Sequence, residues 1–110
     1  MLKVSMRMVK PGEEQRLRDW LSELMRRQDE VRETFKQETV RHEQGYLLPI
    51  RGGTALIYVV EAEDIEQANQ AYKNSVLPLD AEHKLVMQEV LGEAVPAELL
   101  YEVSLDQEML

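Results

Sequence analysis

The stretch Ala55-Leu56-Ile57-Tyr58-Val59-Val60 is the strongest strand signal in the sequence and decides the fold class. Its nearly continuous apolar character is typical of a strand that is covered on both faces. Helices formed by the rest of the chain can cover one of those faces. A chain of 110 residues has no further layer left for the other face, so the pattern also predicts a partner molecule.

The residues that precede this strand predict two more strands and a helix. Residues 2–9 alternate with a period of two, as in a half-buried strand, and Pro11-Gly12 ends that pattern. Apolar residues then recur at spacings of three and four, which predicts one long helix from Glu13 to about residue 38. Val40 to Ile50 reads as a second strand, and Gly52-Gly53 after it is a hairpin turn signal.

The residues that follow the strand predict two helices and a last strand. Asp64 is expected to cap a short helix, and Asp80 to cap another that stops at Gly92. Residues 100–105 alternate between apolar and polar side chains and are predicted to form the last strand. The tail, residues 106–110, is expected to fray or to reach a partner.

This order is the ferredoxin-like βαββαβ pattern of the α+β class. It predicts one domain over residues 1–110, a four-stranded antiparallel sheet and helices on one face only. Packing two bare sheet faces together would bury both, so we expect a homodimer that closes as an α/β barrel. No internal repeat or low-complexity segment interrupts the pattern.

Composition excludes several classes of function. The formal net charge of −8 disfavours nucleic acid and anionic membranes, both of which select basic surfaces. No apolar run reaches the ~20 residues that cross a bilayer, and the first residues lack a signal-peptide pattern. Without cysteine there is no disulfide, thiolate zinc site or cysteine nucleophile. We therefore expect a cytoplasmic protein without a cofactor.

Several positions between about Met6 and Leu91 resemble the dimeric α/β barrel group of ferredoxin-like proteins. That group includes small cofactor-free monooxygenases and a sugar mutarotase. More narrowly, the sequence is similar to an uncharacterised bacterial family within the group. The residues that carry the resemblance are Trp20, Leu21, Glu43, Tyr58, Glu61-Ala62-Glu63-Asp64, Ser75, Pro78, Asp80, Glu82 and His83.

The resemblance implies a fold and a dimer but no reaction, because the narrower family has no established activity. The sequence also departs from the family pattern after the second strand. The family carries Phe-Leu-Glu and an Asp-Gly turn there, whereas this chain has Tyr46-Leu47-Leu48 and a shorter hairpin at Gly52-Gly53. A carboxylate is therefore missing at Leu48, and chemistry that needs it is not implied.

His83 is the first candidate site residue. Counted from a cap at Asp80 it is the third residue of its helix, on the side of Val86, Met87 and Val90. The helix N-terminus and desolvation both favour its neutral form. A neutral imidazole accepts one hydrogen bond and donates another, which suits ligand orientation or general base catalysis. The alternative is a core histidine bonded to a carboxylate or a carbonyl.

Glu43 is the expected partner of His83, either as an orienting carboxylate or as a latch that fixes the last helix to the sheet. Tyr58 and Tyr72 are expected to line the same space, although Tyr58 could equally be a core residue. Arg7 on the first strand could bind an anionic ligand or form a surface ion pair.

A metal site is not expected, because His42 and Glu43 are adjacent in a strand and point to opposite faces. Ser75 is assigned to a turn rather than to a nucleophile, since no base lies near it in the sequence. Two functions stay open. One is binding of a small ligand between sheet and helices; the other is a cofactor-free monooxygenase- or isomerase-like enzyme with His83 as general base.

Overall fold

The apolar strand of residues 55–60 becomes the inner part of β3 (Gly53–Ala62), next to the centre of a four-stranded antiparallel sheet. The computed structural model describes residues 1–105. The strand order is β2-β3-β1-β4, so β3 and β1 lie inside the sheet and β2 and β4 form its edges. The other elements are β1 (Leu2–Val9), α1 (Glu14–Arg26), α2 (Gln28–Glu38), β2 (Val40–Ile50), α3 (Ile65–Asn74), α4 (Pro78–Val90) and β4 (Leu91–Val95).

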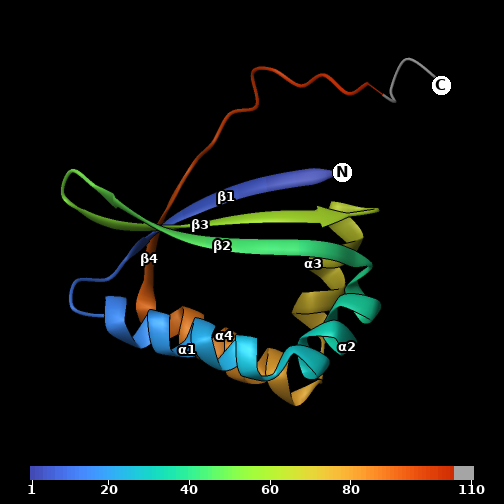
Figure 1. Ribbon diagram of the computed structural model, residues 1–110, viewed down its shortest axis with the longest axis horizontal. Helices are drawn as coiled ribbons and strands as arrows, with labels where there is room; N and C mark the ends of the chain where they lie inside the picture. The colour runs from blue at the N-terminus through green and yellow to red at the C-terminus, as the bar shows by residue number, and fades with distance from the viewer. Residues whose placement is uncertain (106–110) are drawn as a thin grey trace.

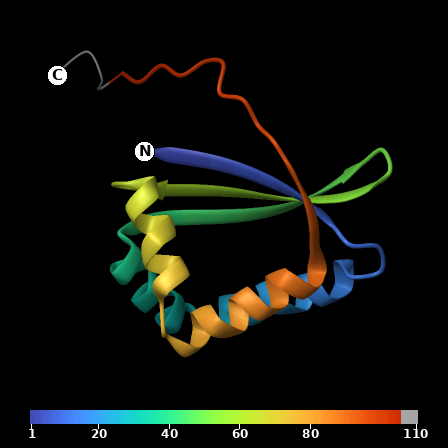
Figure 2. The same cartoon turned by 180° about the vertical axis from the view of Figure 1, so that it is seen from behind.

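All four helices lie on one side of the sheet, as Figures 1 and 2 show from opposite directions. The expected α+β class and the antiparallel sheet are therefore confirmed. The expected ferredoxin-like order is not reproduced without change, because four helices take the place of the single long helix and the helix pair. The core lies between α1, α4 and the sheet and contains Val9, Leu17, Trp20, Leu56, Leu79, Met87, Val90 and Leu91.

The prediction of one long helix up to residue 38 is wrong, because the helix breaks at Arg27. The backbone of Arg27 leaves helical geometry at φ −114° and ψ 38°. Its guanidinium pairs with Glu30 at 2.7 Å and with Glu82 of α4 at 2.6 Å. No proline or glycine marks the break, so the apolar spacing runs through it and conceals it.

The predicted last strand, residues 100–105, is wrong as well. The strand that completes the sheet is β4, which pairs with β1 directly after α4 ends. The residues after Pro96 leave the sheet without pairing, on the side away from the helices (Figure 1). Their apolar side chains are exposed, with Tyr101 81% accessible. The expectation for residues 106–110 lies outside the described part of the chain.

Helix α4 begins two residues before the predicted cap at Asp80. Leu77 takes the extended cap position and Pro78 is the first helical residue, where its fixed φ and missing N–H are tolerated. The N–H of Leu77 donates to Ser75 Oγ at 3.2 Å, a turn contact. The predicted cap of α3 is confirmed, since Asp64 accepts from the N–H of Gln67 at 3.0 Å.

The sheet face opposite the helices carries large apolar side chains that nothing covers within residues 1–105. Val4, in the middle of β1, is 53% exposed. We call this surface the open face. From the strand pairing and register, its main side chains are Leu2, Val4, Met6, Met8, Tyr46, Leu48, Ile57 and Val59. None of the helices within residues 1–105 has the length and apolarity needed to cross a bilayer.

Candidate functional site

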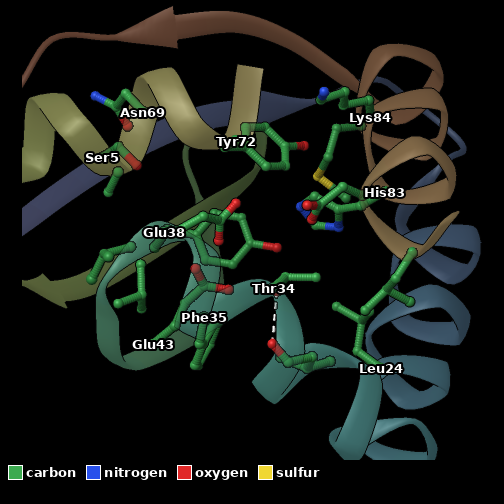
Figure 3. A pocket seen from close by; sticks show the side chains of 18 of the residues that line it. Ser5, Leu24, Thr34, Phe35, Glu38, Glu43, Asn69, Tyr72, His83 and Lys84 are labelled. Atoms are coloured by element: carbon green, nitrogen blue, oxygen red, sulfur yellow. Dashed lines mark hydrogen bonds between the residues drawn. The ribbon is translucent and has the colours of Figure 1, made fainter. Parts of the chain in front are cut away.

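A cavity of about 560 Å³ separates the helices from the covered face of the sheet. Ser5 of β1 and Tyr58 of β3 belong to its sheet wall, and the helices supply the remaining walls. Figure 3 shows Glu38 and Glu43 on one side of this cavity and His83 and Lys84 of α4 on the other. An adjoining cavity of about 760 Å³ opens along the edge strand β2. The two share Leu24, Val31, Phe35, Val40, Glu43 and Tyr58.

A register shift in β2 places Glu43 on the cavity side. Val40 pairs with Ala62 and His42 with Glu61, so an irregularity lies between them. Because of it Val40 and Glu43 both line the cavity, although simple alternation predicts opposite faces for them. His42 and Glu43 point to opposite faces of the sheet, as expected, because they are neighbours in the regular part of the strand.

His83 lies at the centre of an aromatic cluster. Its Nδ1 accepts a hydrogen bond from Trp20 Nε1–H at 2.9 Å. Its ring centroid lies 6.0 Å from that of Trp20, 6.3 Å from Tyr58 and 5.9 Å from Tyr72. The expected partner, Glu43, lines the same cavity, but no hydrogen bond joins it to His83 within residues 1–105.

The protonation of His83 follows from this bond. A neutral imidazole that accepts at Nδ1 carries its proton on Nε2, so Nε2 is a donor. Burial lowers the pKa of His83 from 6.5 to about 4, and the nearby Asp80 only partly opposes that shift. The predicted role of the helix N-terminus is wrong, because His83 is the sixth residue of α4 and lies beyond the first turn.

Glu38, the last residue of α2, was not among the predicted site residues. Only 6% of its surface is exposed, and its Oε2 atom has no hydrogen-bond partner. Burial raises the pKa of Glu38 from 4.5 to about 8, with further increases from the charges of Asp80 and Glu43. The sequence does contain a signal of its burial, because Glu38 follows Phe35 by three residues, on the same helix face as Val31 and Phe35.

Asp80 is a second buried carboxylate. It is 4% exposed, and its Oδ2 atom has no partner. The sequence assigned it to a helix cap, a role that would turn it toward the backbone. It lies instead in the first turn of α4 and lines the cavity, where the positive end of the helix favours a negative charge.

Glu43 is less enclosed than these two carboxylates, because its residue as a whole is exposed on an edge strand. Its carboxylate nevertheless points into the cavity between the sheet and the helices (Figure 3). Desolvation there, followed by the charge of Asp80, raises the pKa of Glu43 from 4.5 to about 7.

Tyr58 and Tyr72 both line the cavity, as expected. The hydroxyl of Tyr58 is buried and has no partner. Desolvation raises the pKa of both phenols, and the charge of Glu43 adds to the shift of Tyr58. Both hydroxyls therefore stay protonated and can donate as well as accept.

Lys3, Arg7 and Lys84 are the cationic side chains that line the cavity, and two of them, Arg7 and Lys84, have other partners. Arg7 donates to the backbone oxygen of Gly92 at 2.7 and 3.2 Å, which ties β1 to β4. It forms no ion pair within residues 1–105, and binding of an anionic ligand by Arg7 stays a prediction. Lys84 Nζ donates to the backbone oxygen of Lys73 at 3.1 Å and lies 5.1 Å from the centroid of the Tyr72 ring. Neither cation neutralises the buried carboxylates through an ion pair within residues 1–105.

Thr39, which follows Glu38, has a left-handed backbone with φ 58° and ψ 27°. Helices often end in this conformation, but with glycine or asparagine, and a β-branched residue is strained in it. The turn sends the chain directly from α2 into β2, so it fixes the positions of Glu38 and Glu43. The buried Thr39 Oγ1 has no hydrogen-bond partner.

Potential metal ligands do not gather in this cavity: within the described residues no three His, Cys, Asp or Glu side chains lie close enough to hold an ion. The cavity thus combines hydrogen-bond acceptors, two phenols and an imidazole donor. Such a set can bind a polar group or accept a proton.

Comparison with protein families gives one match. The model of DUF6176, a family of unknown function, matches residues 2–110, so the chain belongs to that family. Comparison with curated proteins returned no match, and comparison with solved structures returned none either. Membership in this family assigns no activity to the chain.

Proposed function

We propose that this DUF6176 member binds a small ligand in the cavity between its sheet and its helices. One observation carries the proposal: Glu38 Oε2, Tyr58 OH and Asp80 Oδ2 are buried at the cavity without hydrogen-bond partners. An unsatisfied buried polar group costs roughly 1–3 kcal/mol. A ligand that supplies the missing partners would recover part of that free energy on binding.

On the side of α1 and α4, a hydrogen bond between Trp20 and His83 links the two helices beside the cavity. Trp20 fixes one nitrogen of His83, which leaves Nε2–H as a donor of defined direction. The size of the cavity, about 560 Å³, lies within the range of ~300–1,000 Å³ typical of small-molecule sites. His83, Tyr58 and Tyr72 are therefore proposed to orient the ligand.

Native mass spectrometry after incubation with a cell metabolite extract tests ligand binding. The blocking variant is Asn69→Trp, on the part of α3 that lines the cavity. The control is Gln70→Trp, its exposed neighbour outside the lining. We expect an adduct on the wild type and on Gln70→Trp that Asn69→Trp lacks. No adduct, or an adduct on all three proteins, would contradict the proposal.

We further propose that two copies associate through their open faces, as in the dimeric α/β barrel group. The open face is mainly apolar, although the chain has a net charge of −8, and the strand register adds His42 and Glu61 beside Leu2 at one end of it. An apolar patch can pair with itself about a two-fold axis. The exposed apolar segment 97–105 lies on the same side of the sheet (Figure 2) and adds surface that a second copy could cover.

The alternative function is a cofactor-free monooxygenase- or isomerase-like enzyme. His83 is poorly suited as its base, because Nδ1 is bonded to Trp20 and Nε2 carries the proton. Glu43 is better suited, since a pKa of about 7 lies close to the value favoured for a general base at neutral pH. This alternative would be favoured if the bound adduct were lost with time while an adduct of a different mass appeared.

A further inference from the structure

The geometry points to a small organic cation as the ligand: a primary amine or a guanidine carried on an apolar body, with its N–H groups directed at Glu38 and Asp80. This inference rests on the proposed ligand-binding function and names its chemical class. Glu38 and Asp80 come from α2 and α4, so the site joins two helices that are separate in the sequence.

The unpaired atoms of the cavity select a donor. Glu38 Oε2 and Asp80 Oδ2 are carboxylate oxygens on side chains that are 6% and 4% exposed. When ionised, such oxygens accept hydrogen bonds and do not donate them. The third unpaired atom, the hydroxyl of Tyr58, can accept a further bond. An ammonium has three donors and a guanidinium has more, so either group carries enough donors for the three atoms.

The charge of the cavity selects a cation over a neutral donor. Glu38, Glu43 and Asp80 lie close enough for the charges of Asp80 and Glu43 to raise the pKa of Glu38 beyond the effect of its burial. No lysine or arginine forms an ion pair with any of the three within residues 1–105. Above the pKa of Glu38, a neutral ligand would supply hydrogen bonds and leave this repulsion in place, whereas a cation would remove it; below that pKa, a cation would displace the proton.

Lys84 shows what a cation does at this site. Its ammonium group lies over the ring of Tyr72 and lowers the pKa of Glu38, but its hydrogen bond goes to the backbone oxygen of Lys73. The aromatic wall therefore already holds one cation at its edge. The same cavity is lined by Tyr58, Tyr72 and the carboxylates of Glu38 and Asp80, so we propose that a ligand cation sits among them.

The apolar part of the ligand would lie toward the adjoining cavity. Leu24, Val31 and Phe35 line both cavities and present hydrocarbon surface. This surface continues outward between α2 and the edge of β2, so an apolar body of variable length fits there while the cationic head stays with the carboxylates.

Three probes with one body and different head groups test the ligand class: 2-phenylethylamine, 2-phenylethanol and 3-phenylpropionate. Binding is measured by isothermal titration calorimetry at pH 8.5, above the pKa of about 8 of Glu38. We expect the amine to bind at least about tenfold more tightly than either of the others, since hydrogen bonds between charged groups are stronger than those between neutral groups. Equal binding, or preference for the alcohol or the carboxylate, overturns the inference.

Matched variants place the amine in the cavity. Glu38→Gln and Asp80→Asn keep the shape of the side chain and remove its charge. Each should weaken amine binding by about tenfold or more and leave binding of the alcohol unchanged within about threefold. The control, Glu33→Gln, removes an exposed carboxylate of the same helix α2, which pairs with Lys36. If Glu33→Gln weakened amine binding as much, the effect would come from net charge at long range, and the assignment of the site to Glu38 and Asp80 would be wrong.

Proton release gives a second readout that does not depend on a variant. At pH 7 the carboxyl of Glu38 holds a proton, which an arriving cation would displace. The heat of binding should then differ between Tris and phosphate buffers by an amount that matches the release of protons to the buffer. The groups around Glu38 are Asp80 and Lys84 of α4, Glu43 of β2 and Tyr72 of α3. Equal heats in both buffers would contradict the displacement of a proton from Glu38 by the cation.

The failure of this inference differs from the failure of the proposed function. If the alcohol or the carboxylate binds best and Asn69→Trp abolishes that binding, the cavity binds ligands of another class. If no probe binds and metabolite extracts leave no adduct on the wild type, the cavity is not a binding site and both proposals are wrong.

Discussion

Trp20 Nε1–H donates a hydrogen bond to Nδ1 of His83 across 2.9 Å and thereby joins α1 to α4. The two residues are 63 positions apart in the sequence. The bond connects the apolar core, to which Trp20 belongs, with the cavity that His83 lines. A change in the cavity that moves His83 must therefore also disturb the core.

The first prediction concerns the strength of this bond. Trp20→Phe leaves Nδ1 of His83 without its donor, and we expect it to lower the free energy of unfolding by about 3 kcal/mol or more, from lost packing and the lost bond together. A double-mutant cycle with His83→Phe isolates the bond, with an expected coupling of about 1 kcal/mol. Urea unfolding measures all four proteins. Additive effects would show that the bond contributes nothing.

The second prediction concerns acid stability. Burial lowers the pKa of His83 from 6.5 to about 4, so between these values the unfolded chain binds a proton that the folded chain does not. Stability from this group is complete above pH 6.5 and is lost as the pH falls toward 4, by up to ~1.4 kcal/mol per pH unit. The imidazole titration followed by NMR checks this. A midpoint at or above 6.5 would contradict it.

The third prediction concerns alkaline stability. The pKa of Glu38 is raised from 4.5 to about 8, so the folded chain keeps a proton there that the unfolded chain releases. Stability from this group is present below pH 4.5 and is lost as the pH rises to 8, by up to ~1.4 kcal/mol per pH unit. Glu38→Gln removes this loss, so its advantage over the wild type should grow from pH 5 to pH 8.

Urea unfolding at several pH values between 5 and 8 measures this difference. Glu33→Gln is the matched control, because Glu33 is an exposed carboxylate of the same helix. Its difference from the wild type should stay nearly constant over the same range. An advantage of Glu38→Gln that does not change with pH would show that Glu38 titrates normally.

Glu38 also shows what the sequence could and could not predict about the site. His83, Glu43, Tyr58 and Tyr72 were predicted to share one space, and all four line the cavity. Glu38 and the site role of Asp80 were missed, because helical spacing predicts the face of a residue and not what lies opposite. The bond from Trp20 N–H to His83 depends on the packing of α1 on α4, which helical spacing does not predict.

The errors in the fold have a similar origin. Residues 100–105 alternate more regularly than β4, which is short and begins directly after α4, so the local pattern favoured the wrong segment. At the break, Arg27 pairs with Glu82, a residue of another helix, and local spacing carries no signal of that contact. Strand β3, the hairpin at Gly52-Gly53 and the cap of α3 were predictable because their signals are local.

The fourth prediction concerns the strained turn at Thr39. A left-handed backbone costs a residue with a Cβ atom roughly 1–2 kcal/mol and costs glycine little. We expect Thr39→Gly to raise the free energy of unfolding relative to Thr39→Ala by about 1 kcal/mol. Both variants remove the unpaired Oγ1, so the comparison isolates the backbone. Equal stabilities in thermal or urea unfolding would show that the turn is not strained.

The fifth prediction concerns the open face. Val4 lies in β1 with 53% of its surface exposed, and Val4→Glu places a charge in the proposed contact between two copies. A buried unpaired charge is strongly unfavourable, so this variant should be monomeric at concentrations at which the wild type is a dimer. The control is Leu85→Glu, a similar change at an exposed apolar residue on α4.

Sedimentation velocity over a range of concentrations measures the oligomeric state of the three proteins. We expect dimers of the wild type and of Leu85→Glu, since a stable interface needs only ~800 Å² of surface from each copy. A wild type that remains monomeric at all concentrations would contradict association through the open face. Dissociation by Leu85→Glu instead of Val4→Glu would place the contact on the helices, which would then also cover one side of the cavity.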